Sequence, residues 1–270
     1  ANRVHALMKQ CFDYAAAKDL IPASPMAGIE RPGGEETKRD RILNDDEIRL
    51  FWSKVEDPKA VAMSKSTRLA LQLLLVTAQR RAEITFAKWE HFDSDAAMWT
   101  IPATLSKNAK AHSVPLSALA LELLGKLKAI SKDSPWVLPT QYGIKKQGAS
   151  YSERVLSRAV RNNHDNEKWG IAHFTPHDLR RTASSYMTRI GVPRLHVEKV
   201  LNHSVADIAE IYDRHTYLPE KRIALDRWST ELANILANKE RKVVPLERPV
   251  AAASVVDDAV VAARKSAGAA

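Results

Sequence analysis

The sequence is poor in the residues and runs that mark several protein classes. It has one cysteine, Cys11, in 270 residues. A single cysteine excludes an intrachain disulfide and a zinc site built from cysteines, and it fits a reducing, cytoplasmic setting. The sequence also contains no apolar run long enough to cross a membrane and no Gly-rich phosphate loop. No Ser-His-Asp arrangement stands out either.

Acidic residues are outnumbered by basic ones. The chain has 41 Lys and Arg against 32 Asp and Glu, which gives a formal charge of +9 and a pI of about 9.6. Excess positive charge indicates negatively charged binding partners, and the usual ones are nucleic acid and acidic membrane surfaces. Charge alone does not choose between a nucleic-acid-binding protein and a merely basic one.

The patterning divides the chain into four parts. Residues 1–20 carry Val4, Leu7 and Met8 at helical spacing, and we expect them to be the last helix of an upstream domain. Residues 21–42, rich in Pro, Gly and charge, are typical of a linker. Residues 43–240 are predicted to form the folded domain, and 241–270 a tail that is partly disordered or packed on a partner. Because the first residue is Ala, we expect a fragment of a longer protein.

The folded part is predicted to be mainly helical, with a small β-hairpin. A capping-box pattern at Asn44 to Glu47 opens a helix to about Val55, and Thr67 to Thr77 is a helix apolar on nearly all sides. The other predicted elements are strands at Ala97–Ala103 and His112–Leu116, a helix from Ser117 to about Ile130, a short buried strand at Trp136–Pro139, a helix at Tyr151–Asn162, and a terminal helix packed through Ile223, Leu225, Trp228, Leu232 and Ile235. The hairpin turn carries Lys107 and Lys110.

The stretch from Thr175 to Tyr212 carries the clearest chemical signal. Thr175 is a good helix N-cap, and Pro176 suits the first helical position. His177 and Arg180 then lie one turn apart on one face, before Gly191 and Pro193 stop the helix. A second helix from about Arg194 to Leu201 ends at His203, and a third ends near Tyr212. The ends of these helices are expected to bring together a cluster of basic groups and a phenol.

Two further groups of arginines are candidates for binding phosphate. Arg80 and Arg81 follow a buried helix, and burying an unpaired guanidinium is costly. We therefore expect at least one of them to find an anion, either Glu83 or a ligand. Arg154, Arg158 and Arg161 share one face of a predicted helix. That face either follows DNA phosphates or is simply solvated.

The cluster favours phosphodiester chemistry without a metal. Divalent metal sites for phosphoryl transfer need several carboxylates, which are scarce here. A zinc site from His177, His203 and His215 matches no common spacing. Two arginines can instead bind the non-bridging phosphate oxygens, and a tyrosine can attack phosphorus. Its usual pKa is about 10, so nearby cations and a histidine would help to remove its proton, while a hairpin lysine donates one to the leaving oxygen.

From about Asn2 to about Leu232, the sequence resembles the tyrosine recombinase (phage integrase) family. The residues that carry the resemblance are TAQRRAEI with Arg80, SKNAKAHSVPL with Lys107, HDLRRT with His177 and Arg180, LNH with His203, and Tyr212. Each motif alone is weak, but together, in this order and spacing, they are specific. The region around Tyr212 and Trp228 looks closest to integrases of prophages and genomic islands.

The resemblance implies an α+β, mainly helical, DNA breaking-rejoining catalytic domain. It assigns catalysis to Arg80, Lys107, His177, Arg180, His203 and the nucleophile Tyr212, with Glu83 as structural support and no metal or other cofactor. It also implies a homotetramer on paired double-stranded DNA attachment sites in the bacterial cytoplasm, associated with the nucleoid when acting, with an excisionase and a DNA-bending host factor as further partners. Residues 1–20 would end a core-site-binding domain. We assign additional DNA contacts to Arg81, Lys110, Arg154, Arg158 and Arg181.

Three positions depart from the family pattern, which usually has Gly where Ala78, Ala82 and Asn202 stand. Because alanine tolerates a helical backbone well, we expect Ala78 and Ala82 to be helical, and Asn202 is acceptable if a left-handed conformation is needed there.

Several alternatives stay open at the level of sequence. Lys110 competes with Lys107 as the hairpin lysine, and Tyr217 competes with Tyr212 as the nucleophile. A type IB topoisomerase-like enzyme and a catalytically silent DNA-binding remnant are the two alternative functions. The intact set of reactive residues disfavours the silent remnant.

Overall fold

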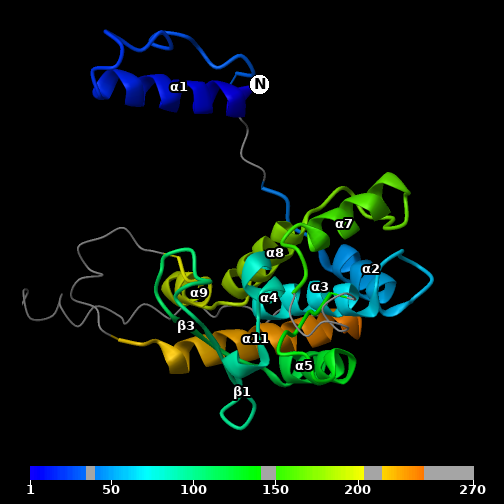
Figure 1. The fold of residues 1–270 in the computed structure, drawn as a ribbon. Helices are drawn as coiled ribbons and strands as arrows, with labels where there is room; N and C mark the ends of the chain where they lie inside the picture. The colour runs from blue at the N-terminus through cyan, green and yellow to red at the C-terminus, as the bar shows by residue number, and fades with distance from the viewer. Residues whose placement is uncertain (35–39, 141–149, 204–214, 240–270) are drawn as a thin grey trace, which may run out of the picture.

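The computed structural model describes residues 1–34, 40–140, 150–203 and 215–239. These residues are mostly helical, with a small sheet (Figure 1), which confirms the predicted class. The elements are α1 (Asn2–Ala17), α2 (Asp45–Glu56), α3 (Lys65–Thr77), α4 (Arg81–Thr85), the 3-10 helix η1 (Trp89–His91), β1 (Phe92–Asp93), β2 (Met98–Ile101), β3 (His112–Pro115), α5 (Ala118–Ser131), α7 (Val155–Asp165), α8 (Pro176–Arg189), α9 (Arg194–Val200) and α11 (Leu218–Leu236).

Helix α3 is the central element of the folded part. Every residue from Ser66 to Thr77 is buried, and α2, α4, α5, α7, α8 and α11 all pack against it. A helix surrounded in this way must be apolar around most of its circumference, as its sequence is. Trp228 of α11 donates a hydrogen bond from Nε1 to the carbonyl of Leu75, 2.8 Å away. The expected buried helix is thus confirmed as the core around which the others assemble.

The helix ends are fixed by local hydrogen bonds that the sequence indicates. At α2, the Glu47 N–H donates to Asn44 Oδ1 over 2.9 Å, and the Asn44 N–H donates to the Glu47 carboxylate over 3.0 Å. At α8, the acceptor is Asp178: the N–H and the hydroxyl of Thr175 both donate to its Oδ2, over 2.8 and 2.9 Å. Helix α8 ends at Arg189, just before Gly191 at φ +82°. Both predicted helix starts are confirmed.

The sheet is three-stranded and antiparallel, in the order β1-β2-β3. Its β2–β3 hairpin, with Met98 opposite Pro115 and Ile101 opposite His112, confirms the predicted one. The strand predicted at Trp136–Pro139 was wrong. Only isolated bridges form there, from Trp136 to Lys88 and from Pro139 to Ser150, since proline has no N–H with which to continue a ladder.

Two further details differ from the sequence expectations. Helix α7 begins at Val155 rather than Tyr151, after a turn closed by a bond from the Val155 N–H to the Ser152 carbonyl. Ile223 does not pack in the core but is 54% exposed, while Leu225 and Trp228 are buried. Ile223 lies two positions from Leu225, so the helical period places it on the opposite face of α11.

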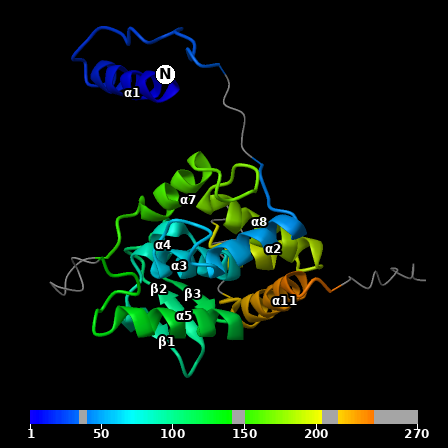
Figure 2. The same ribbon diagram turned by 90° about the vertical axis from the view of Figure 1, so that its right-hand side faces the viewer.

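Helix α1 lies apart from the other helices in both views (Figures 1 and 2). Its own following segment packs on it: His5 Nε2 lies 2.9 Å from the Ile29 carbonyl, and the Gly33 N–H donates to Asn2. Val4 and Leu7 are exposed on this helix. Across the described ranges, none of the helices combines the length and apolarity that a membrane crossing requires.

Candidate active site

A pocket of about 560 Å³ collects the side chains of five of the six predicted catalytic residues. Arg80 comes from the turn between α3 and α4, Lys107 from the β2–β3 loop, His177 and Arg180 from α8, and His203 from the segment that follows α9. The sixth, Tyr212, lies outside the described residues. Gln79, Arg81, Ala82, Glu153 and Pro176 complete the lining. Segments more than a hundred positions apart thus meet at one concave, basic surface.

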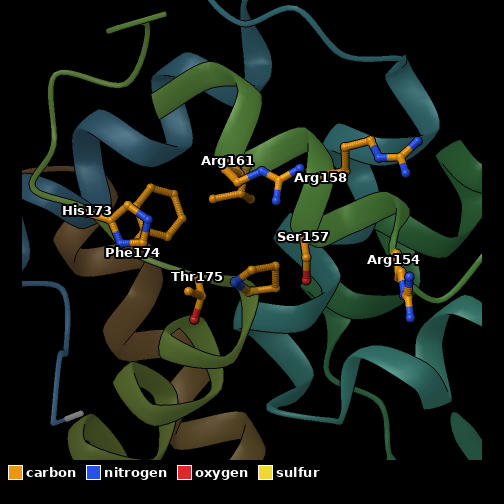
Figure 3. A pocket seen from close by; sticks show the side chains of 9 residues that line it. Arg154, Ser157, Arg158, Arg161, His173, Phe174 and Thr175 are labelled. Carbon is orange, nitrogen blue, oxygen red and sulfur yellow. The ribbon is translucent and has the colours of Figure 1, made fainter. Parts of the chain in front are cut away.

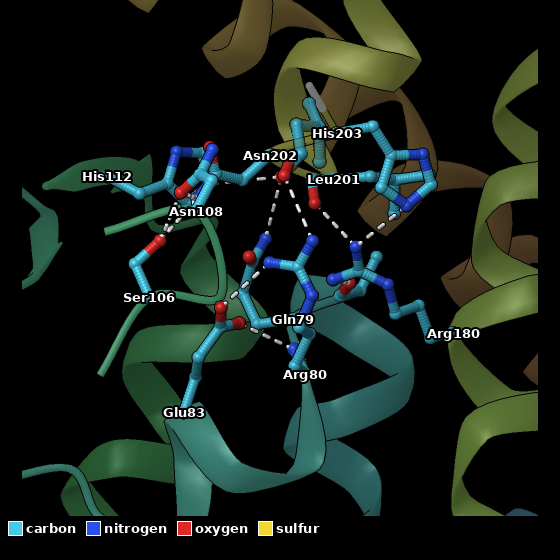
Figure 4. Close-up of polar contacts among 12 residues, drawn as sticks. Gln79, Arg80, Glu83, Ser106, Asn108, His112, Arg180, Leu201, Asn202 and His203 are labelled. Carbon is cyan, nitrogen blue, oxygen red and sulfur yellow. Dashed lines mark hydrogen bonds and ion pairs between the residues drawn. The ribbon is translucent and has the colours of Figure 1, made fainter. Parts of the chain in front are cut away.

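Arg80 is held by three hydrogen bonds. Its Nη1 donates to Glu83 Oε1 over 2.9 Å, and its backbone N–H donates to the other carboxylate oxygen over 2.7 Å. Its Nη2 donates to the carbonyl of Asn202, 2.9 Å away (Figure 4). The Glu83 side chain is 1% exposed, so a charge-assisted pair of this kind fixes the guanidinium firmly. Glu83 is therefore the anion that the arginine pair required.

Arg180 is buried, at 3% exposure, and is held by main-chain carbonyls. Its Nη1 donates to the Ala78 carbonyl over 2.7 Å, and its Nη2 donates to the Leu201 carbonyl. Burial, followed by the charge of Arg80, lowers the pKa of Arg180 to about 10. The guanidinium remains protonated at pH 7, so the pocket holds two fixed positive charges side by side.

The two histidines of the pocket have different environments. His203 Nδ1 bonds to the carboxylate of Glu198, and its Nε2 lies 3.3 Å from Arg180 Nη2. Since an arginine N–H can only donate, the proton is assigned to Nδ1 and the lone pair to Nε2. Partial desolvation, then Arg181 and Arg180, lowers the pKa of His177 below its usual value. His177 is therefore mainly neutral at pH 7 and can accept a proton.

Ala78 corrects one expectation about the backbone. We expected a helical conformation there, but Ala78 is left-handed, with φ +56°, and terminates α3. In this conformation its carbonyl accepts a hydrogen bond from Nη1 of Arg180. A left-handed alanine costs about 1 kcal/mol or more. Ala82 lies in helix α4, as expected, and Asn202 is left-handed at φ +48°, a conformation that asparagine adopts more readily than most residues.

Three supporting residues escaped the sequence analysis. Glu198 holds His203, and Asn108 bonds through its amide to Asn202. Buried Gln79 donates from Nε2 to the carbonyls of Thr77 and Val200, over 2.8 and 3.1 Å. Glu198 could have been suspected because it precedes His203 by about one helical turn and carries the charge that suits a histidine. Nothing local marks Gln79 or Asn108 as part of the site, because the partners that connect them to it, Val200 and Asn202, are distant in the sequence.

The additional DNA-contact residues fall in three groups. Arg81 pairs with Glu153 at 2.8 Å, and Arg181 pairs with Asp178 at 3.4 Å, so both have acidic partners within the protein. Exposed Arg154, Arg158 and Arg161 line a second pocket of about 380 Å³ (Figure 3). His173, Phe174 and Thr175 form its other side. Lys110, in the hairpin loop, is exposed and does not line either pocket.

The described segments contain no group of three His, Cys, Asp or Glu side chains that could hold a metal ion.

Comparison with curated proteins gives several prophage and phage relatives. Prophage integrase IntZ of Escherichia coli K12 is 27% identical over 91% of this chain and 58% of its own length. The integrase of enterobacteria phage P4 is 28% identical over 86% of this chain and 53% of its own length. The tyrosine recombinase XerC of Xylella fastidiosa M23 is 27% identical over 74% of this chain and 65% of its own length. The chain spans about half the length of the integrases it matches.

Solved structures with the same fold belong to integrases as well. A lambda integrase (residues 75–356) dimer bound to a core site superposes with a TM-score of 0.56 at 20% identity, over 75% of this chain and 71% of that one. The integrase of mycobacterium phage Brujita gives 0.54 at 17% identity, over 87% and 78%. The sequence model of the phage integrase family matches residues 41–218, well over half of the chain. This chain is therefore a member of the phage integrase family.

Proposed function

We propose that this protein is a site-specific tyrosine recombinase, which cuts and rejoins DNA to integrate or excise a mobile element. One observation carries the proposal: Arg80, Lys107, His177, Arg180 and His203, from four separate segments, line a single pocket. Membership of the phage integrase family supports it, as do the named activities of its relatives, a prophage integrase and a tyrosine recombinase.

The proposed reaction exchanges one phosphodiester for another. The Tyr212 oxygen attacks phosphorus and forms a 3′-phosphotyrosine, while the bond from phosphorus to the 5′ oxygen breaks. Arg80 and Arg180 bind the non-bridging oxygens and stabilise the extra charge of the transition state. Lys107 donates its proton to the departing 5′ oxygen. The bond energy stays in the phosphotyrosine, so the reverse attack by a 5′ hydroxyl rejoins strands without ATP or a metal.

The proton of Tyr212 needs an acceptor, and His177 is suited to take it. The lowered pKa of His177 keeps its imidazole mainly neutral at pH 7, which is the form that accepts a proton. His203, with its proton on Nδ1 directed to Glu198, is suited to accept hydrogen bonds at Nε2. Glu83 supports the reaction by fixing Arg80.

The proposed partner is double-stranded DNA at paired attachment sites. Solved integrases of the same fold are described as bound to a core site and, as a tetramer, to a Holliday junction, which supports a homotetramer on two sites. The row of Arg154, Arg158 and Arg161 would bind phosphates beyond the reacting one. An excisionase, a DNA-bending host factor and action at the bacterial nucleoid complete the proposal.

The domain boundaries belong to the same proposal. Residues 1–20 would end a core-site-binding domain, 21–42 would be the linker, 43–240 the catalytic domain, and 241–270 the tail. The separation of α1 from the remaining helices supports the first boundary (Figure 1).

Covalent capture tests the proposal directly. The protein is mixed in EDTA with a nicked duplex spanning an end of the mobile element, and the products are separated on a denaturing gel. We expect a protein–DNA adduct in the wild type and in Tyr217→Phe, but none in Tyr212→Phe, which lacks only the attacking oxygen. An adduct lost only in Tyr217→Phe would identify Tyr217, rather than Tyr212, as the nucleophile. Tight binding without any adduct would identify a silent DNA-binding remnant.

A further inference from the structure

Asn202 connects two parts of the pocket that the sequence separates widely. Its left-handed backbone, at φ +48°, presents the carbonyl oxygen to Nη2 of Arg80 at 2.9 Å. Its side chain leaves on the other side and enters the β2–β3 loop (Figure 4). One residue therefore contacts both the guanidinium that grips phosphate and the loop that carries the lysine.

The side chain of Asn202 binds the two residues that flank Lys107. Its Nδ2 donates to Ser106 Oγ over 2.9 Å, and its Oδ1 accepts from Nδ2 of Asn108 over 3.0 Å. Asn202 Nδ2 also donates to Asn108 Oδ1 over a longer distance of 3.3 Å, so each of the two amides donates to the other. Ser106 Oγ also donates to Asn108 Oδ1 over 2.6 Å. These four bonds form a closed network around the neighbours of Lys107.

The β2–β3 loop depends on these four hydrogen bonds for its order. Lys107 is exposed, and the loop that carries it has few apolar residues that anchor it to the core. Its buried polar residue is Ser106, at 8% exposure. Holding a catalytic group within reach of its target avoids the entropy of searching for it. A glycine at 202 would keep the left-handed backbone and the carbonyl bond to Arg80, but it could not bind the loop.

We infer that Asn202 is a positioning residue, which holds Lys107 over the pocket by binding both of its neighbours in the β2–β3 loop. The inference rests on the proposed function, in which Lys107 protonates the leaving 5′ oxygen. It predicts that removing the amide slows only the step that uses this proton, while the grip of the arginines on phosphate is retained.

The test compares two leaving groups on one nicked duplex. In the first substrate, the scissile phosphate has its normal 5′ oxygen, and in the second a 5′-bridging sulfur replaces it. A thiolate leaves without a proton, so it needs no general acid. We expect Asn202→Gly to form the adduct about 10 to 100 times more slowly on the oxygen substrate, and within about threefold of wild type on the sulfur substrate. Lys107→Ala should show the same pattern more strongly.

Asn238→Gly is the matched control, because Asn238 is also left-handed, at φ +50°, but follows the distant end of α11. It should leave both rates unchanged. Equal slowing of Asn202→Gly on both substrates, or no slowing on either, would overturn the inference. If the wild type forms no adduct on either substrate, the proposed function fails instead.

A second measurement tests the hydrogen-bond network of Asn202 without using the cleavage reaction. The Ala109 N–H donates to the Ser106 carbonyl over 3.1 Å inside the loop, so its hydrogen exchange reports how often the loop opens. We expect exchange about tenfold faster in Asn202→Gly, and unchanged in Asn238→Gly. Unchanged exchange in Asn202→Gly would show that the amide does not hold the loop.

Discussion

Lys221 is a buried cation in the interface between α11 and β3. It is 7% exposed, and its Nζ lies 3.2 Å from the Ser113 carbonyl and 3.4 Å from Nδ1 of His112. Burial, followed by the charge of Lys199, lowers the pKa of Lys221 to about 8. The pKa of His112 falls to about 3, chiefly through burial, so this histidine is neutral at pH 7 and gives Lys221 no repulsive charge. The ammonium is nevertheless costly to bury.

We therefore expect Lys221→Met to stabilise the fold in a pH-dependent way. Lysine has a pKa of about 10.5 when unfolded and about 8 here, so the unfolded chain binds more protons between these values. Stability of the wild type then rises with pH across that window. Lys221→Met should raise the free energy of unfolding by about 1–3 kcal/mol at pH 7, and the gain should shrink as pH rises from 8 toward 10.5.

Urea denaturation at several pH values measures this difference. Lys126→Met, on the exposed side of α5, is the control and should change stability by less than about 0.5 kcal/mol at any pH. A gain in Lys221→Met that does not depend on pH would mean that packing, rather than desolvation of the ammonium, sets the cost.

At the scale of the element, α8 depends on its first turn. Asp178, 1% exposed, accepts from the N–H and hydroxyl of Thr175 and pairs with Arg181. A carboxylate in this position satisfies free donors and suits the positive end of the helix. Because His177 and Arg180 lie in the first two turns, the cap that starts the helix also sets the direction of both side chains.

Asp178→Ala should destabilise the protein by about 1–2 kcal/mol, since it leaves the half-buried donors of Thr175 without their acceptor. The free energy of unfolding in urea measures the loss. Asp226→Ala, at an exposed position of α11, removes the same group without a cap and should change stability by less than about 0.5 kcal/mol. Similar losses in both variants would argue against a special role for this carboxylate.

At the scale of the molecule, positive charge gathers where the two basic pockets open. The excess charge of +9 belongs to the whole sequence, but three arginines line each pocket: Arg154, Arg158 and Arg161 the one, and Arg80, Arg81 and Arg180 the other. Binding to DNA through phosphates releases counterions, so the affinity falls steeply with salt.

Arg158→Gln should therefore flatten the salt dependence of binding to a nonspecific duplex. Each phosphate contact contributes about −0.9 to the slope of log affinity against log salt, so the slope should become less negative by about 1. Fluorescence anisotropy at several salt concentrations measures it. Arg227→Gln, at an exposed position of α11, carries the same charge change and should leave the slope as it is. Equal slopes for the wild type, Arg158→Gln and Arg227→Gln would show that Arg158 does not contact DNA phosphates.

Local signals predicted most of the helices and the hairpin correctly. Asn44 and Thr175 marked helix starts, and the apolar run after Thr67 marked the central helix, because capping and burial follow from near neighbours and periodicity. The failures were the strand at Trp136–Pro139, where proline interrupts a ladder, the start of α7, the backbone at Ala78, and Ile223, which the helical period places on the face opposite Leu225. The order of the reactive residues indicated the family, and the pocket later collected five of them.

The sequence by itself determined the chemistry available to this protein: which residues can bind phosphate, give and take protons, and attack. It also determined the helices that carry them, since those depend on local hydrogen bonding and spacing. Only the tertiary structure decided how these groups are held. Two sets of hydrogen bonds join positions far apart in the sequence. The carbonyl of Ala78, at the left-handed turn, accepts from Arg180, and the side-chain amide of Asn202 bonds to the β2–β3 loop. Bonds of that kind form only after the helices have packed, and no local pattern records them.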